Sequence, residues 1–218
     1  MTKVLIADDC AIVRLGVREL LKQIPGTMVA AEATTGAEVL KLFSTQEINL
    51  LILDLWIDGR YCAEIVEDVK RLYPKTGVIV FAARPEDELG PRAFRAGADG
   101  FLRKGPALDE LLRAVKKVIA RGKFFSAALQ AHMLSQLNGI GHKPRVEELS
   151  GREYEVSVGL ADGESYKKMA ARLGISEKSI STYRARILEK LHLTKNADLI
   201  RDRYERRGPE QAEQAEST

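Results

Sequence analysis

The chain has 218 residues, of which 45% are hydrophobic and 30% charged, and its formal net charge is +3. This is the composition of an ordinary soluble protein, long enough for one large domain or two small ones. The N-terminus lacks the features of a signal peptide, and no apolar run approaches the roughly 18 residues that span a bilayer. We therefore expect a cytoplasmic protein without a membrane segment. Its two cysteines, Cys10 in a buried strand-to-helix junction and Cys62, are expected to be reduced.

Five short apolar strands alternate with helical segments over the first half of the chain. The strands are expected at residues 4–6, 28–31, 50–53, 78–81 and 99–102, and helices include 13–24, 36–43, 63–73 and 108–119. Such alternation requires right-handed crossovers, which place the strands in one parallel sheet covered on both faces. The predicted fold of this half is a doubly wound α/β sheet.

Charged side chains follow the strands of this predicted sheet. Asp8 and Asp9 come after the first strand, Asp54 directly after the third, and Lys104 just beyond the fifth. In an open parallel sheet these strand ends share one crevice, where ligands bind. Three carboxylates and an ammonium there suit Mg2+ and an acyl phosphate, with one carboxylate as the nucleophile. A structural salt-bridge cluster would use the same residue types, and Asp54 alone could merely cap a turn.

Residues 3–121 resemble the receiver domain of bacterial two-component response regulators, with its flavodoxin-like five-stranded sheet. The resemblance rests on the paired acids, on the strand that closes on Asp54, and on the segment from Gly97 to Lys104. It implies that Asp54 accepts a phosphoryl group from a sensor histidine kinase, with Lys104 beside it. The residues implied to hold Mg2+ are Asp8, Asp9, Asp54 and the backbone carbonyl of Trp56. Phe101 is implied to be the ring that changes rotamer on activation.

The sequence departs from the receiver pattern at positions that matter for signalling. Where the family has Ser or Thr after the fourth strand, this chain has Ala82, whose methyl group cannot hydrogen-bond a phosphoryl oxygen. Asp58 and Cys62 replace a usual Pro and a usual Gly, which predicts a rebuilt loop after the third strand. Gly90-Pro91 is expected to shorten or break the fourth helix, because proline removes a helix hydrogen bond and clashes with the preceding turn.

The second half of the chain contains helices only. Residues 122–136 are expected to be partly helical, and 138–144, with glycines and a proline, to be a linker. Ser150 and Glu153 form a predicted capping box, and the turn at 174–176 joins two helices in the helix-turn-helix arrangement. We divide the chain into a receiver domain at 1–122, a helical extension and linker at 123–146, an all-α helix-turn-helix domain at 147–207 and a disordered tail at 208–218.

The longer helix of the predicted helix-turn-helix, residues 177–191, has one buried stripe and one polar face. Ile180, Ile187, Leu188 and Leu191 make the stripe. Residues 165–207 hold 12 Lys and Arg against 5 Asp and Glu, an excess of seven positive charges in a nearly neutral chain. This concentration beside a candidate recognition helix is typical of a protein that binds double-stranded DNA, although such a face could simply be solvated.

Residues 147–207 resemble the LuxR-type helix-turn-helix domain found behind receivers of the NarL/FixJ class. The segments 149–153, 169–176 and 179–191 carry this resemblance. It implies a DNA-facing surface in which Lys178, Ser181, Thr182 and Ala185 face base edges, while Ser179, Tyr183, Arg184 and Lys190 hold phosphates. The helical period places Arg186 on the face opposite the buried stripe. A further helix near 196–204, with Leu199 and Ile200 as its main apolar residues, is implied to pair two copies through a small interface.

The sequence thus predicts a homodimeric transcription regulator whose receiver gates DNA binding through phosphorylation of Asp54. The substitutions at 58, 62, 82 and 90–91 leave open an atypical receiver, in which dimerisation and DNA binding are largely independent of phosphorylation or are set by a protein partner. A hydrolase that works through an aspartyl phosphate is a third possibility. Such enzymes usually carry a second carboxylate two residues after the nucleophile on the first strand, and residues 8–11 lack that spacing. We therefore do not expect an enzyme.

Overall fold

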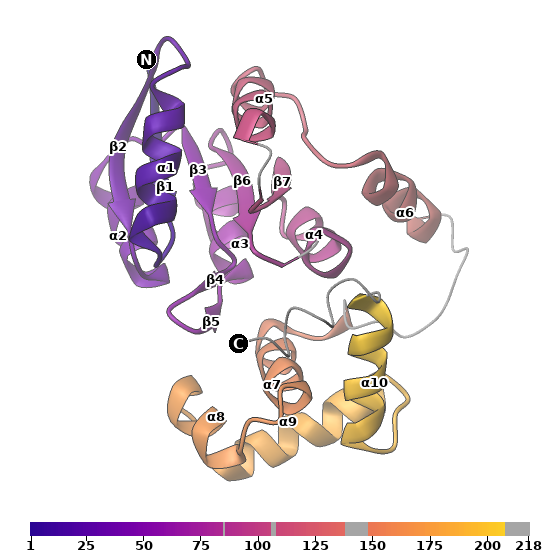
Figure 1. The fold of residues 1–218 in the computed structure, drawn as a ribbon. Coiled ribbons are helices and arrows are strands. Elements are labelled where there is room, and N and C mark those ends of the chain that lie inside the picture. Colours follow the sequence, from indigo (N-terminus) through magenta and orange to yellow (C-terminus); the bar gives the residue numbers. More distant parts are fainter. Residues whose placement is uncertain (85, 106–107, 138–147, 208–218) are drawn as a thin grey trace. The chain divides into compact units, whose positions relative to one another are not determined.

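The computed structural model describes residues 1–84, 86–105, 108–137 and 148–207. The chain divides into two compact units, residues 1–142 and 143–218, each with a buried core of its own (Figure 1). The predicted linker stretch at 138–144, with His142, and the predicted tail at 208–218 lie outside the described residues. Within the described ranges, none of the helices has both the length and the apolar character needed to cross a bilayer.

The first unit is built on a five-stranded parallel sheet in the order β2-β1-β3-β6-β7, which is the predicted flavodoxin-like order. Its strands are β1 (Thr2–Ala7), β2 (Thr27–Ala33), β3 (Leu50–Leu53), β6 (Gly77–Ala82) and β7 (Gly100–Arg103). The central strand β3 pairs with β1 on one side and β6 on the other, and all four of its residues are buried. This explains why the sequence places four aliphatic residues in succession there.

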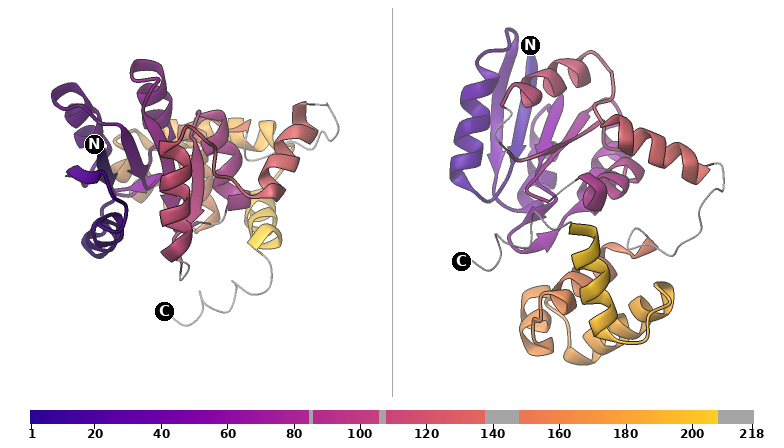
Figure 2. Two further views of the ribbon diagram at one scale, coloured as in Figure 1. Left: turned by 90° about the horizontal axis from the view of Figure 1, so that it is seen from above. Right: turned by 45° about the vertical axis from the view of Figure 1, so that its right-hand side comes forward.

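Helices cover both faces of this sheet (Figure 2). One face carries α1 (Ala11–Leu21) and α5 (Leu108–Ile119), and the other carries α2 (Gly36–Thr45) and α3 (Ala63–Leu72). Because side chains alternate along a strand, Leu50 and Ile52 enter the core beneath α1 and α5, where they meet Val17 and Val115. Burial of each such side chain stabilises the fold by about 1.5–3 kcal/mol.

A small antiparallel hairpin follows β3, made of β4 (Trp56–Ile57) and β5 (Arg60–Tyr61). Its turn residues Asp58 and Gly59 have φ angles of 52° and 65°. Two successive positive φ angles in a two-residue loop are the geometry of the turn that Asp-Gly favours, because it matches the twist of the flanking strands. The loop after β3, which the sequence predicted to be rebuilt, therefore takes the form of a hairpin.

Gly90-Pro91 was predicted to shorten or break the fourth helix, and the predicted break was wrong. Helix α4 (Glu86–Arg95) continues through Pro91. It packs against α6 (Ala127–Leu137), and a Cβ atom at Gly90 would lie only 2.9 Å from Cδ2 of Leu129. We attribute the continuity of the helix to this tertiary packing, which offsets the one hydrogen bond that proline removes. Leu134 on α6 is 60% exposed, so it lies outside the buried core.

The described part of the second unit, residues 148–207, contains four helices, α7 (Gly151–Ala161), α8 (Tyr166–Leu173), α9 (Glu177–Lys190) and α10 (Asn196–Arg207). Both hydrogen bonds of the predicted capping box are present: Glu153 N donates to Ser150 Oγ, and Ser150 N donates to Glu153 Oε2. Gly174 ends α8 at a φ of 66°, a conformation that glycine adopts without strain. The predicted stripe of α9 is buried, as expected.

Two expectations about burial need correction. Cys10 is exposed rather than buried, because it precedes α1 at the rim of the sheet, whereas Cys62 is buried; neither cysteine is in a disulfide. Leu199 on α10 is only 4% exposed and belongs to the core of its own unit. It therefore contributes little apolar surface for pairing two copies through α10.

Candidate functional site

Two buried carboxylates share one lysine at the ends of the parallel strands. The Lys104 Nζ atom lies 2.6 Å from Asp8 Oδ2 and 2.5 Å from Asp54 Oδ2. Asp8 is 2% exposed and Asp54 is 6% exposed, whereas the Lys104 side chain is 18% exposed. The structure thus brings together three of the four charged groups that the sequence placed at this edge.

The backbone of the sheet fixes the positions of these three residues. Asp54 N donates to Ala7 O at 2.9 Å, which holds the end of β3 beside the end of β1. Lys104 N donates to Ala82 O at 2.8 Å, which holds the residue after β7 beside the end of β6. The parallel register therefore places chemistry from three distant segments at one point, as expected of an open α/β sheet.

Burial and charge pairing act in opposite directions on the pKa values of this cluster. For Asp54 burial dominates, so its pKa is raised above the ordinary value although Lys104 hydrogen-bonds the carboxylate. Burial alone would lower the pKa of Lys104, but the hydrogen bonds and charges of Asp54 and Asp8 outweigh it and raise that pKa. A partly desolvated carboxylate beside a firmly protonated lysine is suited to attack an electron-poor phosphorus.

Asp9 lies outside this contact and faces the hairpin instead. Its Oδ2 atom accepts a hydrogen bond from Asp58 N at 3.0 Å, and its side chain is exposed. On the other side of the hairpin, Trp56 N donates to Asp54 Oδ1 at 2.9 Å. Among the described residues, no three carboxylate, imidazole or thiol side chains are grouped closely enough to share a metal ion.

The donor atoms at this edge nevertheless fit a hard divalent cation in kind. Mg2+ prefers carboxylate and carbonyl oxygens and usually takes only one or two carboxylates from the protein. Asp8 and Asp54 supply two buried carboxylates for one ammonium, so the buried cluster carries net negative charge. Asp9 adds a third carboxylate at the rim.

The two positions predicted to act as switches are both buried. Ala82 is 1% exposed at the end of β6, and Phe101 is 3% exposed within β7. Sequence reasoning missed a second group of residues nearby, in which Arg84 lies over the ring of Trp56 and Arg92 over the ring of Tyr61, each at 5.1 Å. Asp58-Gly59 between Trp56-Ile57 and Arg60-Tyr61 was the sequence signal that could have located the hairpin on which both rings lie.

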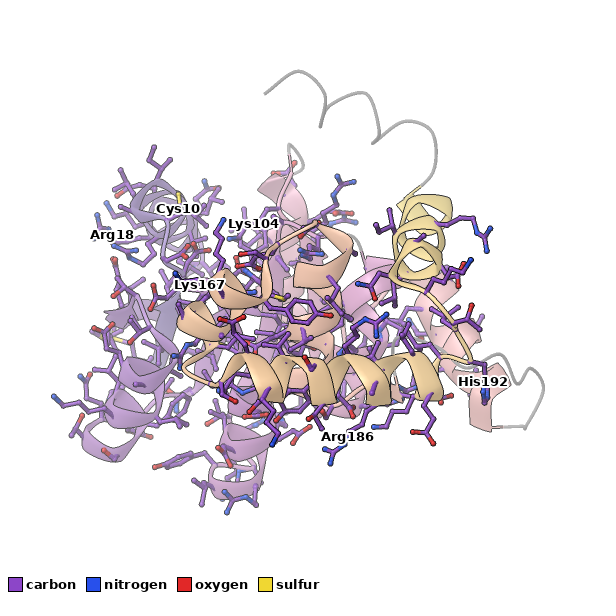
Figure 3. All side chains as sticks on the ribbon, turned by 90° about the horizontal axis from the view of Figure 1, so that it is seen from below. Cys10, Arg18, Lys104, Lys167, Arg186 and His192 are labelled. Atoms are coloured by element: carbon purple, nitrogen blue, oxygen red, sulfur yellow. The ribbon has the colours of Figure 1, made fainter. Side chains whose placement is uncertain are left out.

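In the second unit, helix α9 presents one continuous polar face. Lys178, Ser181, Thr182, Ala185 and Arg186 are all exposed, and Arg186 extends from the outer side of the helix (Figure 3). This face lies opposite the buried stripe of Ile180 and Ile187, as the helical period predicts. Lys167 and Lys168 add exposed positive charge at the start of α8.

The residues implied to hold phosphates are less free than those on the outer face. Arg184 Nε donates to Asn196 Oδ1 at 2.7 Å, which joins α9 to α10. Lys190 Nζ donates to Glu153 Oε2 at 2.7 Å, which joins α9 to the capping box of α7. Ser179 Oγ lies 2.8 Å from Ser176 Oγ, and Tyr183 is half-buried. These four side chains therefore take part in contacts within the domain as well as lying near its surface.

Comparison with known proteins accounts for both units. Residues 4–116 match the response regulator receiver domain, and residues 147–202 match the bacterial regulatory proteins of the luxR family. The response regulator GacA of Pseudomonas aeruginosa is 30% identical over 200 residues, which cover 91% of this chain and 94% of that protein. A putative transcriptional regulator of the same species is 38% identical over 201 residues, covering 92% and 96%.

Solved structures of RcsB from Salmonella share the fold. One RcsB structure has a TM-score of 0.68 at 24% identity, over 92% of this chain and 95% of that chain. Another, described as bound to promoter rprA in the presence of the phosphomimetic BeF3-, has a TM-score of 0.66 at 23% identity, over 92% and 96%. The two family matches and the curated relatives show a DNA-binding transcription regulator of two-component systems. The chain belongs to the response-regulator family, in its NarL/FixJ class, as the two sequence resemblances implied.

Proposed function

We propose that Asp54 is phosphorylated by a sensor histidine kinase in a Mg2+-dependent reaction, and that this controls DNA binding by a homodimer. The observation that carries the proposal is the contact of Lys104 Nζ with both Asp54 and Asp8 at the strand ends. In this proposal residues 1–122 are the receiver, 123–146 connect it, and 147–207 bind DNA.

In the proposed reaction, a carboxylate oxygen of Asp54 attacks the phosphorus of a phosphohistidine. The new O–P bond forms as the N–P bond breaks, and the imidazole leaves with the bonding electron pair. Lys104 offsets the negative charge of the incoming phosphoryl group. Asp8, Asp9, Asp54 and the carbonyl of Trp56 would hold Mg2+, which when bound neutralises phosphoryl oxygens.

For the second unit, we propose that the outer face of α9 enters the major groove. Lys178, Ser181, Thr182 and Ala185 would read base edges, with Ala185 limited to an apolar contact such as a thymine methyl group. Ser179, Tyr183, Arg184, Arg186 and Lys190 would contact the phosphate backbone. Arg186 is the best placed of these, because it is exposed, whereas Arg184 and Lys190 would first give up contacts to Asn196 and Glu153.

The homodimer is proposed because DNA sites of this kind have two-fold symmetry and because a relative is described as a dimer. One solved RcsB structure is described as two RcsB dimers bound to two parallel DNAs. A dimeric reader of a palindromic operator places two recognition helices about one helical turn apart. Because Leu199 lies in the core of its own unit, we expect the pairing surface at α10 to be small and to depend on contacts elsewhere.

A second candidate is an atypical receiver whose DNA binding depends little on phosphate. The absence of a hydroxyl group at Ala82 favours it, because the side chain at this buried position cannot hydrogen-bond a phosphoryl oxygen. In that case a protein partner or the receiver alone sets the oligomeric state. We favour phosphorylation control because the nucleophile, the acidic groups and the lysine of the phosphoryl chemistry are all retained.

Beryllofluoride, which mimics the phosphoryl group, separates the two candidates. The full chain is titrated with the analogue and Mg2+, and binding is followed by the fluorescence of Trp56, the only tryptophan. Operator affinity is then measured by fluorescence anisotropy, and oligomer size by analytical ultracentrifugation. We expect the analogue to raise operator affinity by roughly tenfold, and Asp54→Asn to abolish this response. Bound analogue with unchanged affinity and oligomer size would favour the atypical receiver.

A further inference from the structure

The hairpin after Asp54 is joined to α4 by contacts that the proposed phosphoryl chemistry does not use. Arg92 Nε on α4 donates a hydrogen bond to the Tyr61 hydroxyl at 3.0 Å, and the guanidinium carbon lies 5.1 Å from the centre of the Tyr61 ring. Tyr61 is 7% exposed and Arg92 is 9% exposed. A charge-assisted hydrogen bond combined with a cation–π contact in a buried place makes a strong, directional link.

The same hairpin is bonded directly to the carboxylate of Asp54. Trp56 N, at the start of the hairpin, donates to Asp54 Oδ1 at 2.9 Å. Trp56 and Tyr61 are paired across the two strands, and their ring centres are 6.1 Å apart. Because the strands have two residues each and the turn between them is tight, the N–H group that is bonded to Asp54 and the ring of Tyr61 belong to one short hairpin.

On its other side, α4 is held by the segment that leads into α6. Glu86 Oε1 accepts a hydrogen bond from Ser126 N at 3.1 Å, and the ring of Phe94 meets the ring of Phe125 edge-on at 5.2 Å. Gly90 allows Leu129 of α6 to approach the α4 backbone closely. Figure 2 shows α6 beside α4. Of the described helices, α6 is the last one before the second unit.

We infer that Tyr61 and Arg92 are positioning residues that transmit the state of Asp54 through α4 to α6, in place of the hydroxyl group that Ala82 lacks. This inference rests on the proposed phosphorylation of Asp54. Phosphorylation joins one carboxylate oxygen of Asp54 to phosphorus, which removes the negative charge of the carboxylate and alters the hydrogen bond from Trp56 N. The hairpin follows, and the Tyr61–Arg92 bond moves α4 with it, which changes the packing of Leu129 and Phe125.

The test uses the full-length chain and the variant Tyr61→Phe, which removes the hydroxyl group and keeps the ring. Tyr73→Phe is the matched control, because it removes a hydroxyl group from a ring that packs on Phe43 elsewhere in the unit. Trp56 fluorescence measures analogue binding, and amide hydrogen exchange at residues 127–133 measures the response of α6. In the unaltered chain and in the control, beryllofluoride with Mg2+ should change this exchange by about threefold or more.

In Tyr61→Phe we expect analogue affinity within about twofold of the unaltered chain, while the exchange response of α6 is largely lost. Arg92→Lys should behave alike, and the double variant should be no worse than either single variant, because both act through one contact. A purely structural role for the hydroxyl group would lower stability and leave the analogue-dependent response intact.

Each other outcome is also decisive. If the unaltered chain binds the analogue without a change in α6, or if Tyr61→Phe keeps the full response, the relay is overturned and the proposed phosphorylation stands. If the unaltered chain does not bind the analogue, the proposed phosphorylation fails. The relay, which rests on that phosphorylation, then fails with it.

Discussion

At the scale of single residues, Lys104 holds together two carboxylates that would otherwise repel each other. Asp8 and Asp54 are almost fully buried, and both contact its ammonium. Taking two carboxylates out of water is costly unless a cation lies between them, so this lysine contributes to folding as well as to the proposed chemistry. Burial raises the pKa of Asp54 more than the hydrogen bond and charge of Lys104 lower it, so this pKa stays above its ordinary value.

Replacing Lys104 by Met should destabilise the first unit by about 2–4 kcal/mol, because two buried carboxylates lose their counter-ion. Adding Asp54→Asn to this variant should recover part of the loss, since only one buried charge then remains unpaired. Urea unfolding followed by Trp56 fluorescence measures both. Lys123→Met is the control, because Lys123 is 56% exposed and its pair with Asp99 is worth at most about 1 kcal/mol. A double variant no more stable than Lys104→Met would contradict this reasoning.

At the scale of elements, α9 combines a buried stripe that fixes its position with an exposed face that is free to bind. The stripe of Ile180 and Ile187 is fully buried, whereas Lys178 and Arg186 extend into solvent. Binding to the phosphate backbone releases condensed counterions, so each phosphate contact adds to the salt dependence of affinity. Contacts to base edges instead change sequence preference.

Arg186→Ala should weaken binding to all DNA sequences and reduce the salt slope of log affinity by about one. Lys178→Ala should cost about 1–3 kcal/mol on the preferred operator and relax the preference at one base-pair position. Anisotropy titrations at several salt concentrations, on the operator and on scrambled duplexes, measure both effects. Lys22→Ala is the control, because it removes an exposed lysine of the first unit. Equal losses for all three variants would argue against this use of α9.

The capping box of α7 also joins α7 to α9. Burial acts to raise the pKa of Glu153, but Lys190 and the backbone N–H of Ser150 outweigh it, so the pKa is lowered from 4.5. A carboxyl group with a lowered pKa in the folded state stabilises that state fully above its unfolded pKa. The contribution is lost as the pH falls through the lower, folded value.

Glu153→Gln should therefore destabilise the second unit by about 1–2 kcal/mol at neutral pH. The difference from the unaltered chain should shrink as the pH falls below 4.5, the ordinary pKa of this group. Thermal unfolding followed by circular dichroism at several pH values measures the difference. Glu189→Gln, on the exposed side of α9, serves as control and should show no such trend. A difference that stays constant down to acid pH would exclude Glu153 as its source.

At the scale of the whole molecule, the chain contains two units with separate hydrophobic cores. The core of the first unit lies between a parallel sheet and its helices, and that of the second lies among α7, α8, α9 and α10. Units with separate cores need not unfold together, and a ligand stabilises only the unit that binds it.

Calorimetry of the full chain should accordingly show two unfolding transitions. Beryllofluoride with Mg2+ should raise only the transition of the first unit, by about 2.7 kcal/mol at a hundredfold excess over its dissociation constant. Operator DNA should raise only the transition of the second unit. The variant Asp54→Asn should lose the first shift and keep the second. A single transition, or a shift of both by the analogue, would show that the two units unfold as one.

Much of the fold was predictable from local pattern. The run Leu50 to Leu53 required burial on both faces, and the acids after it required a shared edge, because parallel strands end together. The capping box at Ser150 and the stripe on α9 followed from hydrogen bonding and helical period within a few residues. The capping box and the stripe depend on neighbours in the chain, so the sequence by itself determined them.

The remaining features depend on contacts between distant segments. Pro91 remains inside a helix where α6 packs on it, Leu199 is taken into the core of its own unit, and Asp9 is engaged by the hairpin rather than by the lysine. The bond between Tyr61 and Arg92 joins residues 31 positions apart that show no shared pattern. Only the tertiary structure decided these features. Whether a side chain is buried, hydrogen-bonded or exposed at such a position depends on which distant segment packs against it.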